Sequence, residues 1–153
     1  MSPVLEKSLS PAAPQPSGPA AGEANSRLNV AVIFTSVEAT LAALKQAAEL
    51  ACPVNASLTL IVPQIVPYPL PLTSPPVLLD FSERRFRVIA DQSRVETTVR
   101  IYLCRDRDVM LRGILRPRSL VVIGGTKQWW PTPERRLARK LRRAGHEVIL
   151  TEN

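Results

Sequence analysis

Short strand-like segments alternate with segments of helical periodicity along the chain from Leu28 onward. Two of the strand-like segments, Leu28–Phe34 and Leu120–Ile123, are nearly continuous apolar runs, which is typical of strands buried on both faces of a parallel sheet. Because parallel strands are joined by crossover helices, the alternation predicts an α/β fold with a doubly wound, five-stranded parallel sheet of the flavodoxin-like or Rossmann-like kind. The other predicted strands are Ser57–Val62, Val95–Leu103 and Glu147–Thr151.

The first and last of the four predicted helices have clear start and stop signals. Thr35, followed three residues later by Glu38, has the pattern of a capping box, and Pro53 ends this helix. Thr132 at the N-cap, followed by a proline, starts the last helix, and Gly145 stops it. The apolar stripe of the last helix comprises Leu137, Ala138, Leu141 and Ala144. The helices between them are predicted over about 77–93, burying Leu78, Phe81 or Ser82, Phe86 and Ile89, and from Asp106 or Arg107 to Pro117.

The sequence predicts one edge of the sheet and the point at which the second strand ends. Val95–Leu103 alternates between apolar and polar residues, which predicts an edge strand with one wet face, on which Tyr102 lies. Pro63 is the first of the prolines that crowd residues 63–76. Because proline cannot donate a hydrogen bond to a neighbouring strand, the second strand is expected to end at Val62 and to lead into an extended loop.

Residues 1–27 are rich in Pro, Ala and Ser and have no apolar period, so they predict a disordered tail before a single domain over 28–153. The tail lacks the basic start and apolar segment of a secretory signal, and no apolar run reaches the roughly 18 residues that a membrane span needs. The chain is therefore expected to be cytoplasmic, without a membrane partner and with Cys52 and Cys104 as free, mostly buried thiols.

The layout and several segments resemble the universal stress protein family over nearly all of Leu28–Asn153. The segments that carry the resemblance are LNVAVIFTSVEATLAAL, SLTLIVPQIVP, SLVVIGGTK and the terminal EVILT. The resemblance implies strand order 3-2-1-4-5, in a fold also described as adenine nucleotide alpha hydrolase-like. It further implies a homodimer through the last strand, where Val148 and Leu150 lie, and, in one branch of the family, ATP bound in the crevice between the first and fourth strands.

The residues at that crevice depart from the nucleotide-binding branch. Thr35 stands where that branch has an acidic residue, and the later glycines of its glycine motif are missing after Gly124-Gly125. A residual anion site would use these glycines and a helix N-terminus, with ATP as its candidate ligand. The candidate ligand-binding residues are Thr35, Ser36, Gly124, Gly125, Thr126, Lys127 and Thr132.

The last helix and the loop before it carry further candidates. The basic side of the helix is interpreted either as a solvated face or as a phosphate-binding surface, and the net charge of +7 raises nucleic acid as a partner. Trp129 and Trp130 either contact a partner or lie in a loop folded back over the sheet edge. The basic residues are Arg135, Arg136, Arg139, Lys140, Arg142 and Arg143.

The sequence contains no Ser/His/Asp set, P-loop or metal-binding motif, and a structural role is expected for His146, so no enzymatic activity is predicted. The leading hypothesis is a non-enzymatic, universal stress protein-like regulatory or adaptor module that is dimeric and whose ATP binding is weakened or lost. The first alternative is an ATP-binding regulator of the stress response. The second alternative is a basic protein associated with nucleic acid.

Overall fold

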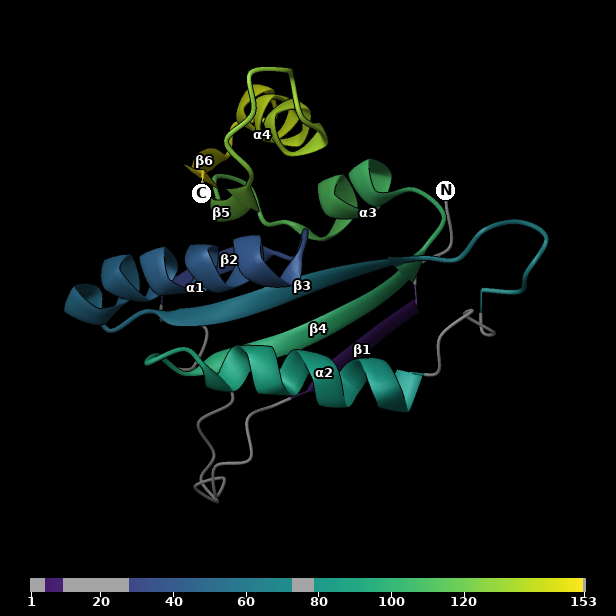
Figure 1. The fold of residues 1–153 in the computed structure, drawn as a ribbon, viewed down its shortest axis with the longest axis horizontal. Coiled ribbons are helices and arrows are strands. Elements are labelled where there is room, and N and C mark those ends of the chain that lie inside the picture. The colour runs from purple at the N-terminus through teal and green to yellow at the C-terminus, as the bar shows by residue number, and fades with distance from the viewer. Residues whose placement is uncertain (1–4, 10–27, 73–78, 153) are drawn as a thin grey trace.

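A computed structural model describes residues 5–9, 28–72 and 79–152. Within these residues six strands form one sheet in the order β1-β4-β3-β2-β5-β6 (Figure 1). The strands β2 to β6 are parallel, so their order along the sheet is 3-2-1-4-5, and the predicted doubly wound α/β fold is confirmed. The strands are β1 (Leu5–Leu9), β2 (Asn29–Ile33), β3 (Ser57–Ile65), β4 (Thr97–Cys104), β5 (Leu120–Gly125) and β6 (Glu147–Glu152).

Helices cover both faces of the sheet. In the described residues they are α1 (Val37–Ala51), the short 3-10 helix η2 (Cys52–Val54), α2 (Leu79–Asp91), α3 (Arg107–Ile114) and α4 (Pro133–Arg143). The first two α-helices pack on one face, and α3 and α4 pack on the other. The central strand β2 is therefore buried from its second residue onward, as its apolar sequence predicts. No helix in the described part of the chain is both long enough and apolar enough to span a bilayer.

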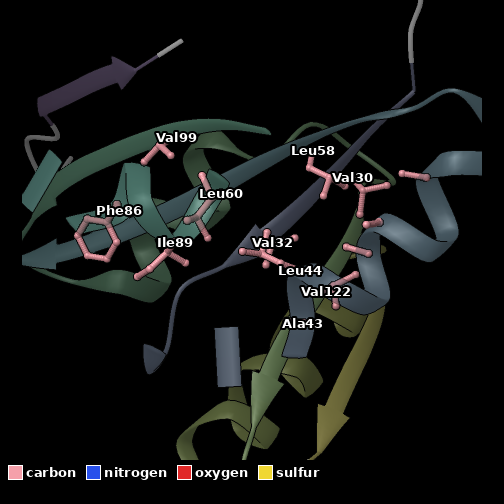
Figure 2. Packing of buried hydrophobic residues seen from close by; sticks show 14 of the residues in the cluster. Val30, Val32, Ala43, Leu44, Leu58, Leu60, Phe86, Ile89, Val99 and Val122 are labelled. Atoms are coloured by element: carbon pink, nitrogen blue, oxygen red, sulfur yellow. The ribbon is translucent and has the colours of Figure 1, made fainter. Parts of the chain in front are cut away.

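The core beneath α1 and α2 fixes the position of α1. Figure 2 shows Val32 of β2 beside Leu44 of α1, with Phe86 and Ile89 of α2 gathered around Leu60 of β3. Most of the buried residues of α1 are alanines, so this helix lies close to the sheet. The contacts of α1 with β5 result from this close approach, and they shape the candidate site.

One prediction about the N-terminus is wrong. Leu5–Leu9 are not disordered but form β1, which pairs antiparallel with β4 from Leu5 opposite Leu103 to Leu9 opposite Val99. Figure 1 shows β1, in purple, beside β4, in green, so β4 is not an edge strand. The segment LEKSL contains no β-branched or aromatic residue, and its strand conformation comes from satisfying the free backbone groups of β4. Residues 1–4 and 10–27 of the predicted tail lie outside the described residues.

The second strand also differs from its prediction, because β3 continues through Pro63 to Ile65. The amide of Phe34 donates to the carbonyl of Ile61, so in the alternating strand pattern the nitrogen of Pro63 faces the same side as Ile61. The pairing of β2 with β3 ends at Ile61, so no strand lies there to receive a hydrogen bond. Pro63 is tolerated because its missing N–H faces this vacated side.

Three side chains have a different exposure from the one expected. Tyr102 is buried rather than wet, because it belongs to the core cluster that α3 and α4 complete. Cys52 is exposed, because it follows the last residue of α1. Ala144 is exposed as well, because α4 ends at Arg143.

The prediction for α2 left two side chains as alternatives for burial. The structure buries Ser82 and leaves Phe81 63% exposed, while Phe86 and Ile89 are buried as predicted. The predicted start of this helix, including Leu78, lies outside the described residues.

Candidate functional site at the carboxyl ends of β2 and β5

The crevice that a doubly wound sheet offers to ligands lies where the strand order reverses, at the carboxyl ends of β2 and β5. Thr35 and Ser36 follow β2, and Gly124 and Gly125 end β5. The fold therefore brings these four predicted site residues to one place.

The crevice is bridged by a hydrogen bond. The hydroxyl of Thr35 donates to the carbonyl oxygen of Gly124 across 2.7 Å. The amide of Thr35 donates to the hydroxyl of Thr40, a fully buried residue, at 3.2 Å. Thr35 thus holds the first turn of α1 and the end of β5 together.

The N-cap of α1 is one residue later than predicted. The hydroxyl of Ser36 accepts a hydrogen bond from the amide of Ala39 at 3.3 Å, which makes Ser36 the N-cap. Glu38 is then the second helical residue rather than the third, so the predicted capping box does not form. The capping pattern identified the helix start but not which hydroxyl is free to reach β5.

The lack of a side chain at Gly124 allows α1 to pack against β5. A Cβ atom added at Gly124 would lie 2.1 Å from the carbonyl oxygen of Ala39, so the first turn of α1 rests directly on the backbone of β5. At Gly125 an added Cβ would lie 3.4 Å from Leu150 Cδ1, an ordinary van der Waals distance. The space that a glycine would leave for a phosphate is occupied at Gly124 by α1.

Of the remaining predicted ligand residues, one is already bonded and two lie in the exposed loop after β5. Thr132 is buried and is the N-cap of α4, where its hydroxyl accepts from the amide of Arg135 at 3.3 Å. Thr126 and Lys127 are exposed in the loop that joins β5 to α4. Of the predicted ligand residues, the structure therefore joins Thr35 to Gly124 directly and engages the hydroxyl of Thr132 in capping α4.

A pocket that the sequence patterns did not reveal lies beside the crevice, between α2 and the carboxyl ends of β2 and β3. Its volume is about 230 Å³, and its lining includes Phe34, Pro63, Arg85 and Phe86. Phe34 and Phe86 meet edge to face, with ring centroids 4.8 Å apart. The volume is below the roughly 300–1,000 Å³ of ordinary small-molecule sites. The available signal was the aromatic residue directly after β2.

A second hollow, of about 400 Å³, lies on the opposite face of the sheet and is lined mainly by polar residues. Part of its floor is already bonded, because the Asn29 side-chain amide donates to the Thr59 hydroxyl at 2.8 Å. Arg100 and Arg116 also line it. This hollow includes strand residues near the amino ends of β2 and β3, away from the switch point.

Half of the predicted basic residues of α4 hold the fold together. Arg135 pairs with Glu152 at 2.6 Å, and Lys140 pairs with Asp108 of α3 at 2.5 Å. The hydrogen bond from Lys140 holds the pKa of Asp108 below its usual range, although burial opposes this effect. Arg142 donates to the carbonyl oxygen of Val148 from two nitrogens, at 2.9 and 3.3 Å.

The predicted interface residues of the last strand are mostly occupied within the chain. Val148 is buried, and Leu150 packs against the core cluster under α4. The amide of Glu147 donates to Ser119 of the segment before β5, so the carbonyl of Val148, one residue later, faces the outer edge of β6. Arg142 therefore covers an acceptor of the outer edge.

The two tryptophans are both exposed, which excludes the interpretation in which their loop folds back over the sheet. Trp129 is 74% exposed and Trp130 is 66% exposed. Their rings stack on each other, with centroids 4.6 Å apart and planes 9° from parallel.

His146 and Cys104, whose side chains are of the types that act in acid–base or nucleophilic catalysis, are both buried. His146 is buried, and its Nδ1 accepts a hydrogen bond from the amide of Ser119 at 3.2 Å. Burial, aided by the charge of Asp106, raises the pKa of the Cys104 thiol to about 11. A thiol with this pKa stays protonated at neutral pH and is a poor nucleophile. No group of three His, Cys, Asp or Glu side chains that would hold a metal occurs among the described residues.

Comparison of the sequence with models of known protein families gives no match, and neither does comparison with curated proteins.

Proposed function

We propose that the protein is a cytoplasmic, non-enzymatic regulatory or adaptor module of the universal stress protein type, whose nucleotide crevice is closed. The observation that carries the proposal is the hydrogen bond from Thr35 to Gly124 together with the seating of Ala39 against Gly124. Both contacts lie at the switch point of the sheet, which is where open α/β sheets take their ligands.

The energetic cost of opening the crevice supports this proposal. A ligand that reached Gly124 would have to replace the hydrogen bond from Thr35, and leaving such a partly buried acceptor unpaired costs about 1–3 kcal/mol. It would also have to displace the first turn of α1, and Ala43 and Leu44 of that helix are buried in the core. Removing a side chain such as that of Leu44 from the core costs about 1.5–3 kcal/mol.

Calorimetric titration of ATP with Mg²⁺ into nucleotide-free protein, at two salt concentrations, tests the proposal. We expect no saturable heat up to millimolar ATP for the natural sequence. The variant Thr35→Ser, which keeps the hydroxyl, serves as the control, and Thr35→Ala removes the bridge. Saturable micromolar binding by the natural sequence would reject the closed-crevice proposal in favour of an ATP-binding regulator.

The proposed assembly is a homodimer through β6, whose outer edge has no partner strand in the described part of the sheet. For two β6 strands to pair, Arg142 must release the Val148 carbonyl. Light scattering would test the assembly against twice the chain mass of 16.8 kDa. A single-chain mass at all accessible concentrations would reject it.

A further inference from the structure

The loop before α4 carries an exposed aromatic stack. Trp129 and Trp130 lie one ring on the other, 4.6 Å apart, and both expose most of their surface. Figure 1 shows the loop that joins β5 to α4 as an arch beside α4. Large aromatic rings are usually well buried, so a solvent-exposed stack is a feature that the packing of the described chain does not explain.

The same region carries cations that the fold does not use. Arg136, Arg139 and Arg143 of α4 are exposed and have no ion pair or hydrogen bond through their side chains within the described residues. Their spacing of three and four residues puts them on one stripe of the helix. With a rise of about 1.5 Å per residue, the stripe extends about 10 Å along the helix.

The stripe is next to the aromatic stack in the chain. Thr132 is the N-cap of α4, so Trp130 lies three residues before Pro133, the first helical residue, and Arg136 lies in the first turn of the helix. Lys127, which is also exposed, adds a cation that precedes the tryptophans in the chain. We call these exposed residues, which are neighbours along the chain, the Trp–Arg surface: Trp129, Trp130, Arg136, Arg139 and Arg143.

We propose that the Trp–Arg surface binds single-stranded nucleic acid. An unpaired base presents a flat face that stacks on an aromatic ring, and the phosphates that follow it present charges at regular intervals. Three guanidinium groups over about 10 Å suit two or three successive phosphates, and arginine binds phosphate with two parallel hydrogen bonds. The net charge of +7 adds a long-range attraction for a polyanion.

An anionic membrane fits the surface less well. A helix that lies in a membrane interface buries its apolar side in lipid, whereas the apolar side of α4 is buried in the protein, with Leu137, Ala138 and Leu141 at most 2% exposed. Duplex nucleic acid also fits less well, because its bases are stacked on each other and offer no free face to the tryptophans.

The protein contains its own probe for this proposal, because Trp129 and Trp130 are its only tryptophans. Addition of a twelve-nucleotide oligothymidine or oligouridine is expected to quench their emission saturably. Binding should weaken with salt, with a slope of log K against log salt of about −2 for three phosphate contacts on a single strand. Equal or tighter binding of a matched duplex or of heparin would overturn the proposal, because only charge would then be recognised.

Vesicles that contain anionic lipid supply the membrane comparison in the same assay. A shift of the tryptophan emission with vesicles and no response to either oligonucleotide would also overturn the proposal. Responses to oligonucleotide with none to vesicles would support it.

Variants, measured by anisotropy of a labelled oligonucleotide, separate stacking from charge. We expect Trp129→Ala or Trp130→Ala to weaken binding about tenfold without changing the salt slope. Arg139→Ala should weaken binding and reduce the slope by about 0.7. Arg94, which is exposed before β4, provides a charge-matched control. An equal loss from Arg94→Ala, or no loss from the tryptophan variants, would overturn the proposal.

Discussion

The Thr35 hydroxyl donates a hydrogen bond to the Gly124 carbonyl oxygen across 2.7 Å, joining the segment that follows β2 to the end of β5. This bond lies at the switch point of the sheet, where doubly wound folds bind their ligands. On the side of α1, Ala39 packs closely against the same residue, Gly124. Under the proposed function, the same contacts that stabilise the fold at this site exclude a ligand from it.

Gly124→Ala is expected to destabilise the protein by about 3 kcal/mol or more. The new Cβ would lie 2.1 Å from the Ala39 carbonyl oxygen, so the backbone of α1 would have to move to remove the clash. This movement is expected to cost more than the usual 1–3 kcal/mol of overpacking. Gly113→Ala is the control, because its Cβ meets nothing within 4 Å and alanine favours the helix by about 1 kcal/mol. Urea unfolding would measure both, and a loss below 1 kcal/mol at Gly124 would contradict the packing described for α1.

The two cysteines should differ sharply in reactivity. Burial raises the pKa of Cys104 to about 11, whereas Cys52 is exposed. A thiol reagent at pH 8 should therefore modify Cys52 rapidly and Cys104 slowly. Cys52→Ser should remove the fast phase, and Cys104→Ser should leave it. Rapid modification of Cys104 in the folded protein would show that β4 is more accessible than the structure indicates.

The raised pKa of Cys104 also predicts a pH dependence of stability. The unfolded chain releases the thiol proton near pH 9.0, and the folded chain keeps it until about pH 11. The stabilising contribution of this group is therefore complete below pH 9 and is lost as the pH rises through that interval. Comparison of urea unfolding for the natural sequence and Cys104→Ser at pH 8 and pH 10.5 would isolate this loss. A difference that does not change with pH would reject it.

Arg142→Ala is expected to strengthen self-association. Removing the guanidinium frees the Val148 carbonyl at the outer edge of β6, and a free edge acceptor is a site for strand addition. Arg143→Ala is the matched control, since Arg143 is exposed on the same helix and has no bonded partner among the described residues. Sedimentation equilibrium would measure the dimer dissociation constant. An unchanged constant for Arg142→Ala would argue against assembly through β6.

Features with local causes were predictable from the sequence. Thr132 marks the start of α4 and Gly145 marks its end, as predicted, because a capping hydroxyl and a glycine each act within one turn of the helix. Gly145 has a φ of +97°. The apolar run around Val32 identified the central strand, because a strand that is buried on both faces is apolar along its own length.

Features that depend on distant partners were not predictable in this way. The bond between Thr35 and Gly124 joins residues 89 positions apart, and β1 forms because β4 offers a free edge. Periodicity identified the basic side of α4, but only the folded chain brings Glu152 to Arg135 and Asp108 to Lys140. The division of α4 into bonded and free cations therefore required the structure.

The most direct test of the closed crevice is a titration of isotope-labelled protein with ATP and Mg²⁺, followed through backbone amide resonances. We expect that the amides of Thr35, Thr40 and Gly124 do not shift saturably up to millimolar ATP, because the bonds of Thr35 and the contact of Ala39 with Gly124 already engage the atoms of this site. Saturable shifts of these three amides would show that the crevice opens to nucleotide and would contradict the proposed closure.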